Sequence, residues 1–393
     1  MREELSSISG HCDPAFQPVR AALAESLAGG FEVGAALAVY VDGRAVVDLW
    51  GGHADAERTR PWGRETIVNL YSVGKAIGAV CLLRLVDAGR LDLDAPVARY
   101  WPEFAQANKG EIPVRYLLTH QSGLPAIARP LLAGAWSRWE EITAALASQA
   151  PWWTPGAGHG YHVNTQGFLI GELVRRLTGQ TFGHYLRESL TGPAGIDFFV
   201  GFGPELDARC ADVLPPRPSP EADELRRRLA VDPGRLSGLA AMRMSAYRNP
   251  PDFSGMGVVN TRSWRAAEVP STNGHGTARG VARLYSALAG HGAIDGVAVL
   301  SAETIARASA QQVYGDDLML ERPTRFGLGF QLTMAERRLG PNPRAFGHFG
   351  AGGSLGFADP DARVAFGYAM NQSRGGWQHP HVRHFVDLVY AAL

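Results

Sequence analysis

The chain has 393 residues, 46% of them hydrophobic, and its 38 basic residues balance its 38 acidic residues. This length exceeds the size at which one core usually stops growing, so we expect two domains or one domain with a large insertion. The zero net charge gives no electrostatic reason to expect nucleic acid or a membrane surface as partner. The sequence shows no export signal and no stretch near the roughly 20 apolar residues of a membrane span. We therefore expect a cytoplasmic protein that acts on small molecules, with its oligomeric state left open.

Strand-forming segments occupy both ends of the chain. Residues 14–28 have helical apolar spacing, and two β-branched runs then flank Asp42-Gly43, a strong hairpin signal. Toward the other end, residues 325–334 predict one strand, two more strand-like runs flank the turn at 359–361, and residues 381–393 have helical spacing. Between these ends, helices are predicted at roughly 73–88, 139–149, 165–178, 181–190 and 278–289.

These elements predict an α+β fold, in which an antiparallel sheet is flanked by the terminal helices and carries an inserted, mostly helical domain. We place the sheet domain at residues 1–85 and 275–393, and the helical domain at residues 86–274. A Pro-rich excursion at about 211–260 is expected to be exposed and to shape one wall of a cleft.

The rarer residue types carry some information. Cys12, Cys81 and Cys210 are scattered without paired spacing, so no disulfide framework is predicted. Only two of the basic residues are lysines, Lys75 and Lys109. A lysine retained in a chain that otherwise uses arginine suggests a task that arginine cannot perform, such as losing its proton near neutral pH.

Ser72 and Lys75 lie three residues apart at the start of the helix predicted from residue 73. Residues at this spacing share one helix face, so a hydroxyl and an amine are presented together at the helix N-terminus. Burial lowers the pKa of a lysine, and its neutral amine can then help to remove the serine proton. Backbone N–H groups at the helix start can stabilise an oxyanion. The alternative is that Ser72 only caps the helix and Lys75 is a surface charge; the apolar setting favours acyl transfer.

Several segments together resemble one known family. Residues 72–75 read S-x-x-K, residues 155–176 read PGAGHGYHVNTQGFLIGELVRR, and residues 347–360 read GHFGAGGSLGFADP. The segments LLTHQSGLP and STNGHGTARGVARLYSALAG add to the pattern. From about residue 34 to residue 371, the chain resembles the serine β-lactamase-like, penicillin-recognising fold. Within it, the chain is most similar to the class C-like carboxylesterases called family VIII esterases.

The resemblance implies a fold, a mechanism and a set of site residues. The fold is the β-lactamase/transpeptidase type, and Ser72 is acylated while Lys75 and Tyr161 share the general-base and general-acid work. Because tyrosine has a pKa near 10, Lys75 is expected to supply the charge that keeps the phenol partly ionised. The third motif implies supporting roles for His348 and Gly350. The backbone N–H groups of Ser72 and Ala351 are expected to form the oxyanion hole, and Trp153 and His162 are candidates for an acyl pocket.

Two departures from the lactamase pattern favour a neutral ester as substrate. Where lactamases carry Y-x-N, this chain has Tyr161-His162-Val163, with Asn164 one position out of register. Where they carry Lys-Thr-Gly, it has a motif beginning with His348, which can donate a hydrogen bond near Tyr161 but carries full charge only below about pH 6.5. We therefore predict a carboxylesterase acting on small acyl esters. Acyl transfer to another acceptor, weak β-lactam hydrolysis and a non-enzymatic sensor remain alternatives.

Other motifs have plainer explanations. Ser354 lies in G-x-S-x-G, but too few residues follow it for an α/β-hydrolase fold, so its glycines are assigned to the third motif. His379, His381 and His384 are expected to lie on different helix faces, so no metal site is predicted. Thr277 in GHGTARG is expected to cap a helix rather than to open a phosphate loop, and no cofactor is predicted.

Overall fold

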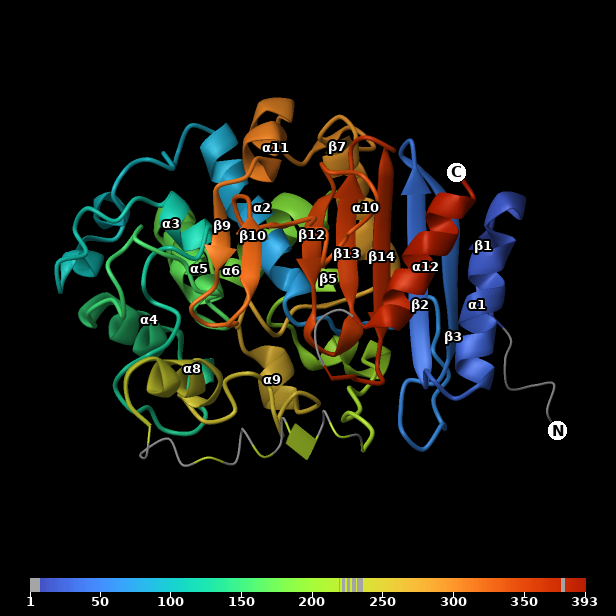
Figure 1. Cartoon of the computed structure of the whole chain (residues 1–393), viewed down its shortest axis with the longest axis horizontal. Coiled ribbons are helices and arrows are strands. Elements are labelled where there is room, and N and C mark those ends of the chain that lie inside the picture. Colours follow the sequence, from blue (N-terminus) through green and yellow to red (C-terminus); the bar gives the residue numbers. More distant parts are fainter. Residues whose placement is uncertain are drawn as a thin grey trace.

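The computed structural model describes residues 8–218, 236–375 and 379–393, with a few positions between 219 and 235. Nine strands form one antiparallel sheet in the order β1-β3-β2-β14-β13-β12-β11-β10-β9 (Figure 1). Their bounds are β1 Ser9–Cys12, β2 Gly34–Val41, β3 Arg44–Gly52, β9 Val313–Asp316, β10 Pro323–Phe326, β11 Gln331–Leu332, β12 Phe346–Phe349, β13 Leu355–Asp359 and β14 Val364–Met370. Part of the predicted Pro-rich segment lies outside the described residues.

The centre of the sheet joins the two ends of the sequence. Asp42 and Gly43 both adopt positive φ, at 52° and 78°, and so turn β2 into β3 as the sequence predicted. On its other edge, β2 pairs with β14, with Ala35 opposite Met370. The predicted α+β fold class is therefore confirmed. The domain boundaries stay a prediction.

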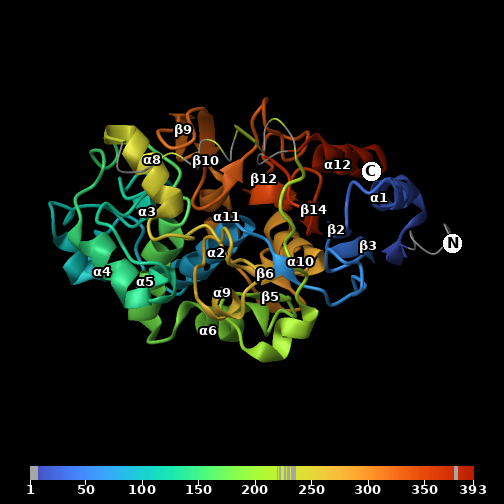
Figure 2. The same ribbon diagram turned by 90° about the horizontal axis from the view of Figure 1, so that it is seen from below.

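Helices cover both faces of this sheet. Figure 2 shows α1 (Gln17–Ala28) and α12 (Pro380–Ala391) on one side, and α10 (Ala278–Ala289) and α2 (Val73–Asp87) on the other. The side chains of β14 differ in size on the two faces of the sheet. The large side chains of Phe366 and Tyr368 face the layer of α1 and α12, while small side chains face α10. Small residues allow α10 to approach the strand closely.

The remaining elements lie mainly in the helical part and its connections. They are α3 Arg115–Leu118, α4 Trp139–Ser148, α5 Thr165–Thr178, α6 Phe182–Leu186, α8 Gly238–Arg248, α9 Arg262–Ala266, α11 Ala302–Ser309, β4 Val68–Asn69, β5 Phe198–Phe199, β6 His275–Gly276, β7 Ala293–Ile294 and β8 Val297–Ala298. Short strands β4, β6 and β5 form a separate sheet beside the start of α2. The five predicted helices are thus present, the one at 181–190 as α6 followed by a π-helical turn at 187–191.

One predicted element is wrong. Residues 325–334 were expected to form a single strand, but the structure divides them between β10 and β11. Gly329 has a φ of 83°, and a Cβ there would lie 2.2 Å from Ala79 Cβ. The chain therefore turns at this position while its backbone rests against α2, which only glycine permits.

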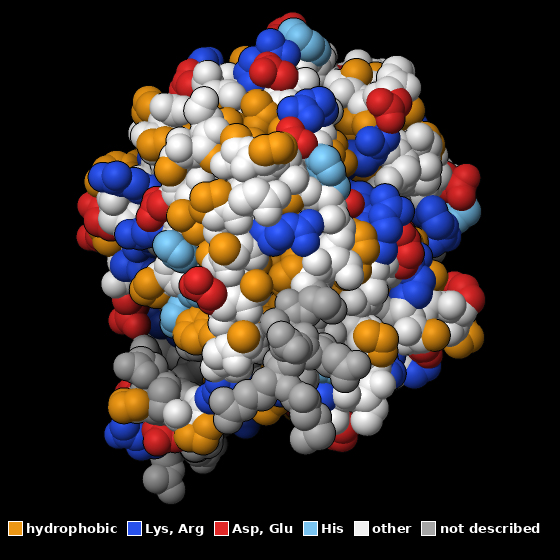
Figure 3. Space-filling view, turned by 90° about the vertical axis from the view of Figure 1, so that its right-hand side faces the viewer, with side chains coloured by type: hydrophobic (Ala, Val, Ile, Leu, Met, Phe, Trp, Pro, Cys, Tyr) orange, Lys and Arg blue, Asp and Glu red, His pale blue; other side chains and the backbone are white. Residues whose placement is uncertain are grey.

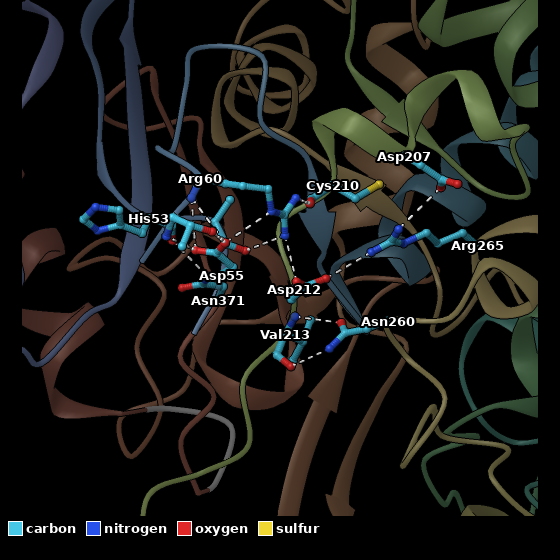
Figure 4. Close-up of polar contacts among 12 residues, drawn as sticks. His53, Asp55, Arg60, Asp207, Cys210, Asp212, Val213, Asn260, Arg265 and Asn371 are labelled. Atoms are coloured by element: carbon cyan, nitrogen blue, oxygen red, sulfur yellow. Dashed lines mark hydrogen bonds and ion pairs between the residues drawn. The ribbon is translucent and has the colours of Figure 1, made fainter. Parts of the chain in front are cut away.

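Polar contacts close the base of the excursion between residues 213 and 260 (Figure 4). The backbone N–H of Val213 donates to Asn260 Oδ1 at 2.8 Å, and Asn260 Nδ2 donates to Val213 O at 3.0 Å. Next to this pair, Asp212 accepts from Arg60 at 2.7 Å and from Arg265 at 3.3 Å. The start and end of the excursion are thereby held together and tied to the loop after β3.

The surface agrees with the balanced composition. On the face shown in Figure 3, Lys and Arg side chains are interspersed with Asp and Glu. In the part of the chain that the structure describes, no helix is both long and apolar enough to cross a membrane.

The close contact between α10 and β14 leads to a stability prediction. A Cβ at Gly367 would lie 2.2 Å from Ala278 O and 2.8 Å from Ala282 N, which are backbone atoms that cannot rotate away. We expect Gly367→Ala to lower the free energy of unfolding by about 1–3 kcal/mol, measured by urea denaturation. Gly63→Ala is the control, because its Cβ would meet only Thr66 Oγ1 at 3.8 Å. Equal stability of the two variants would contradict this description of the packing.

Candidate active site

Ser72 stands at the N-terminus of α2, in the turn that follows the short strand β4. The residue before it, Tyr71, has a φ of 48°, a left-handed conformation that is strained for a residue with a side chain. Among the described residues, the first turn of α2 donates no capping hydrogen bond to the Ser72 side chain. The hydroxyl is thus not used as a helix cap, and it is available for chemistry.

Lys75 is buried, with 1% of its surface exposed, so it is not a surface charge. Its Nζ lies 3.2 Å from Ser72 Oγ and donates to two backbone carbonyls, Val163 O at 2.5 Å and Ser271 O at 3.0 Å. Burial lowers the pKa of the Lys75 amine well below its ordinary value. The predicted pairing of hydroxyl and amine is present in the structure.

Lys109, the other lysine, is also buried, but its hydrogen-bond partners differ from those of Lys75. Its Nζ donates to three carbonyl oxygens, Gln106 O at 2.7 Å, Ala147 O at 2.9 Å and Gln149 O at 2.6 Å. Three donors on a compact ammonium match three carbonyls, a geometry that a planar guanidinium does not offer. A lysine can therefore be retained for the geometry of its hydrogen bonds as well as for a catalytic task. The scarcity of lysine in the sequence does not by itself identify Lys75 as a catalytic residue.

Tyr161 reaches the same place from the segment that precedes α5. Lys75 Nζ lies 4.8 Å from the centre of its ring, and its hydroxyl lies 3.5 Å from His348 Nε2. Burial raises the pKa of the Tyr161 phenol well above its ordinary value, although a hydrogen bond with Ser72 acts against this shift. At neutral pH the phenol is protonated, so the expected partly ionised tyrosine is not supported.

His348 on β12 is a neutral hydrogen-bond acceptor in this arrangement. Burial, with a smaller effect from Lys75, lowers the pKa of its imidazole to about 3. Its Nδ1 lies 2.7 Å from Phe349 O, and a carbonyl can only accept, so Nδ1 carries the proton. Nε2 is then free to accept from the Tyr161 hydroxyl. The expectation that His348 donates a hydrogen bond near Tyr161 is therefore wrong.

The turn between β12 and β13 lies directly against the residues before Ser72. Ser354 Oγ donates to Leu70 O at 3.0 Å. A Cβ at Gly350 would lie 2.0 Å from Ser354 Oγ and 2.4 Å from Leu70 O, so only glycine fits there. This contact holds Gly350, the residue before Ala351, against the residues that precede Ser72, and the oxyanion-hole role of Ala351 stays a prediction.

The two candidate pocket residues differ in their contacts. His162 is fully buried; its Nδ1 donates to Gly160 O at 2.6 Å, and its Nε2 accepts from Leu124 N at 3.2 Å. Trp153 is half-buried, and its ring centre lies 6.0 Å from that of His162. His162 thus joins the tyrosine segment to the 122–124 loop, while Trp153 is only partly buried, and the pocket role of both residues stays a prediction.

An apolar cluster surrounds Tyr161. Phe326 stacks on the Tyr161 ring with centroids 6.0 Å apart, and Met242 of α8 belongs to the same cluster. Arg243 Nε donates to Leu318 O at 2.8 Å, which fastens α8 beside this cluster. Helix α8, which lies within the predicted excursion, therefore packs beside the candidate site, while the cleft wall expected of the Pro-rich segment stays a prediction.

Two other predictions concern residues outside this group. Thr277 caps α10 by accepting from Gly280 N at 2.9 Å, as expected. His379 caps α12 by accepting from His381 N at 3.3 Å, and His381 Nε2 lies 2.9 Å from Ser26 Oγ. Among the residues that the structure describes, no three His, Cys, Asp or Glu side chains are grouped as a metal site would need.

Several contributors to the site were not predicted. The carbonyls of Val163 and Ser271 that hold Lys75 have no signature in a sequence, because every residue has a carbonyl. Asp317 also went unrecognised, although its carboxylate accepts from the backbone N–H of Tyr161. The Gly-Asp-Asp segment in which it lies has no sequence feature that indicates the partner 156 residues away.

Comparisons with known proteins agree with this architecture. The sequence matches the Beta-lactamase family over residues 19–391. It is 34% identical over 383 residues to esterase/beta-lactamase LipL of Mycobacterium tuberculosis, and the alignment covers 93% of this chain and 83% of that protein. The fold is similar to the crystal structure of a family VIII carboxylesterase, with a TM-score of 0.89, 38% identity and coverage of 98% of this chain and 100% of that one.

A penicillin-binding protein homologue from Caulobacter crescentus is also similar, with a TM-score of 0.87, 36% identity and coverage of 98% of this chain and 100% of that one. The fold and these relatives define the class: the protein is a serine hydrolase. The chain belongs to the beta-lactamase family.

The two candidate serines can be separated by mutation. Ser354→Ala removes one buried hydrogen bond to Leu70 O, so we expect a loss of stability of about 0.5–1.5 kcal/mol and retention of most esterase activity. Urea denaturation and hydrolysis of p-nitrophenyl butyrate measure the two effects. If Ser354→Ala abolished hydrolysis in a folded protein, the assignment of Ser354 to the turn would be wrong.

Proposed function

We propose that this protein is a carboxylesterase that hydrolyses small acyl esters through an acyl-enzyme on Ser72. The observation that carries the proposal is the environment of the Lys75 amine. A neutral amine has two N–H bonds and one lone pair, and two carbonyl oxygens accept from Nζ. The lone pair is then left for the third neighbour, Ser72 Oγ, from which it can accept the proton.

Acylation follows from these positions. Lys75 Nζ takes the hydroxyl proton as Ser72 Oγ forms its bond to the ester carbonyl carbon. Negative charge develops on the carbonyl oxygen, and the backbone N–H groups of Ser72 and Ala351 are proposed to stabilise it. As the tetrahedral intermediate collapses, the bond to the alcohol oxygen breaks and leaves the acyl group on Ser72.

Tyr161 is proposed to deliver the proton that the leaving alcohol needs. Its phenol is protonated because burial raises its pKa. It gives this proton to the departing oxygen and recovers one from the Lys75 ammonium, so the site ends with a neutral amine again. Acceptance by His348 Nε2 orients the hydroxyl. Water then attacks the acyl-enzyme, with the same groups removing and returning protons.

The surroundings support a neutral, apolar acyl ester as substrate. Tyr161 and His348 are uncharged at neutral pH in this environment, and burial lowers the pKa of Lys75 well below its ordinary value, so the described catalytic group favours a neutral substrate over a carboxylate. Trp153 is the proposed surface for the acyl chain, with His162 behind it. The relatives named as esterase and carboxylesterase support the same substrate class.

Ser72→Ala should abolish hydrolysis of p-nitrophenyl butyrate, because no nucleophile remains to form the acyl-enzyme. Intact-protein mass spectrometry should show a butyryl adduct on the wild type in rapid-quench samples and none on the variant. Ser354→Ala is the matched control and should still be acylated. An adduct that persists in Ser72→Ala would overturn the proposal, while adding an alcohol acceptor and detecting a new ester would reveal acyl transfer.

Lys75→Arg should be almost as damaging as Lys75→Ala, with kcat/KM lowered on the order of a hundredfold or more, since general-base catalysis contributes about 10²–10⁴. Arginine keeps its proton and so cannot act as the base. Steady-state kinetics with p-nitrophenyl butyrate test this, with circular dichroism as a check on folding. Full activity of a folded Lys75→Arg enzyme would exclude the base role.

The pH dependence should show one acid limb. Activity needs unprotonated Lys75, so kcat/KM rises as pH increases through the pKa of Lys75, which burial holds well below the ordinary 10.5. His348, with a pKa of about 3, does not titrate between pH 5 and 9. The enzyme is therefore expected to be active at neutral pH and to lose activity on acidification. A profile that rises only near pH 10 would show an unperturbed lysine.

A further inference from the structure

The turn between β9 and β10 packs against the segment that carries Tyr161. Asp317, the first residue after β9, is buried with 2% of its surface exposed. Its two carboxylate oxygens lie 3.0 Å and 3.1 Å from the backbone nitrogen of Tyr161, which donates to them. A carboxylate from a distant part of the chain therefore holds the backbone of Tyr161, the candidate acid, directly at this residue.

A second set of contacts fixes the same two segments. Leu318 N donates to His159 O at 3.0 Å. Thr324 Oγ1 lies 2.7 Å from His159 Nε2 and donates to Asp317 Oδ2 at 3.1 Å. The residues before Tyr161 are thus joined to the turn by backbone and side-chain bonds together.

Asp317 also shapes its own turn. Its Oδ1 accepts from Met319 N at 2.8 Å and from Leu320 N at 2.9 Å. A buried carboxylate is stable only when such donors compensate for lost hydration, and this one has several. The side chain thereby links a rigid turn to Tyr161, so the position of the turn is transmitted to the phenol.

Tyr161 needs this support because its segment belongs to neither a helix nor a strand. Its hydroxyl lies near both Ser72 and His348, and misplacement of a reacting group by about 1 Å can cost on the order of a hundredfold in rate. Three residues separate Tyr161 from α5, which begins at Thr165, so the helix does not itself fix the position of Tyr161.

We propose that Asp317 is a positioning residue for Tyr161, acting through the Tyr161 backbone N–H to hold the phenol in place for proton transfer. The proposal rests on the proposed function, in which Tyr161 is the acid. It assigns a role in the reaction to a residue that does not touch the substrate.

The test is a double-mutant cycle between Asp317→Asn and Tyr161→Phe, read as kcat and KM for p-nitrophenyl butyrate. The Asn amide nitrogen cannot accept a hydrogen bond, so Asp317→Asn loses part of the carboxylate's acceptor set at nearly constant volume. We expect Asp317→Asn to lower kcat on the order of tenfold or more with KM changed less than about twofold. In the Tyr161→Phe background the same substitution should change kcat little, because the group it positions is already absent.

Asp316→Asn is the matched control, since it makes the same chemical change one residue away at an exposed position, and it should keep wild-type kinetics. Thr324→Val removes one donor to Asp317 and should give a smaller loss of the same kind. If Asp317→Asn does not fold, Thr324→Val carries the cycle in its place.

The outcomes separate two failures. If Asp317→Asn lowers kcat equally in both backgrounds, its effect is general to the fold, and the positioning role is wrong. If Tyr161→Phe loses activity while Asp317→Asn keeps it, the positioning role is also wrong, but the proposed function stands. If Tyr161→Phe alone keeps full activity, the acid role in the proposed function fails first.

Discussion

Burial of one lysine amine is the constraint on which the rest of this site depends. Water cannot solvate Lys75, so its polar atom must find partners within the protein, and it finds two backbone carbonyls and one hydroxyl. The carbonyls belong to the segment after Tyr161 and to the segment before β6. Three separate parts of the chain therefore meet at one nitrogen, and the same burial that demands these partners also lowers the pKa of the amine.

The histidine at the third motif adds no fixed charge to the site. A charged lysine at position 348 would be buried, would repel a charged Lys75 and would have to be neutralised or solvated. A neutral imidazole at this position carries no such energetic cost. His348 instead has a lone pair on Nε2, because its contact with Phe349 O places the ring proton on Nδ1. Electrostatically, the site resembles an apolar cavity with a few directed hydrogen bonds, an environment in which charge is stabilised only where it develops.

What the sequence could reveal depended on the range of the interaction. Ser72 and Lys75 were found because their relation is local and follows from helix geometry. The hairpin at Asp42-Gly43 and the Thr277 cap were found for the same reason. The strand expected at 325–334 failed because Gly329 turns the chain to fit α2, a requirement set by a partner that local spacing does not contain. Asp317 and the carbonyl of Ser271 were missed because their contacts join segments that are distant in the sequence. The hydrogen-bonding role of His348 was mispredicted because a backbone carbonyl, Phe349 O, determines which ring nitrogen carries the proton.

The pairing of β2 with β14 has a consequence for how the protein matures. Gly34 and Asn371, which bond to each other beside this pair, are 337 residues apart in the chain. A ribosome makes Ser72 and Lys75 well before β14, which pairs with β2, and before the turn that lies behind Ser72. Until then β2 presents an open hydrogen-bonding edge, which is a site for mispairing with other chains. The nascent chain therefore carries Ser72 and Lys75 before it contains the segments that pack behind them.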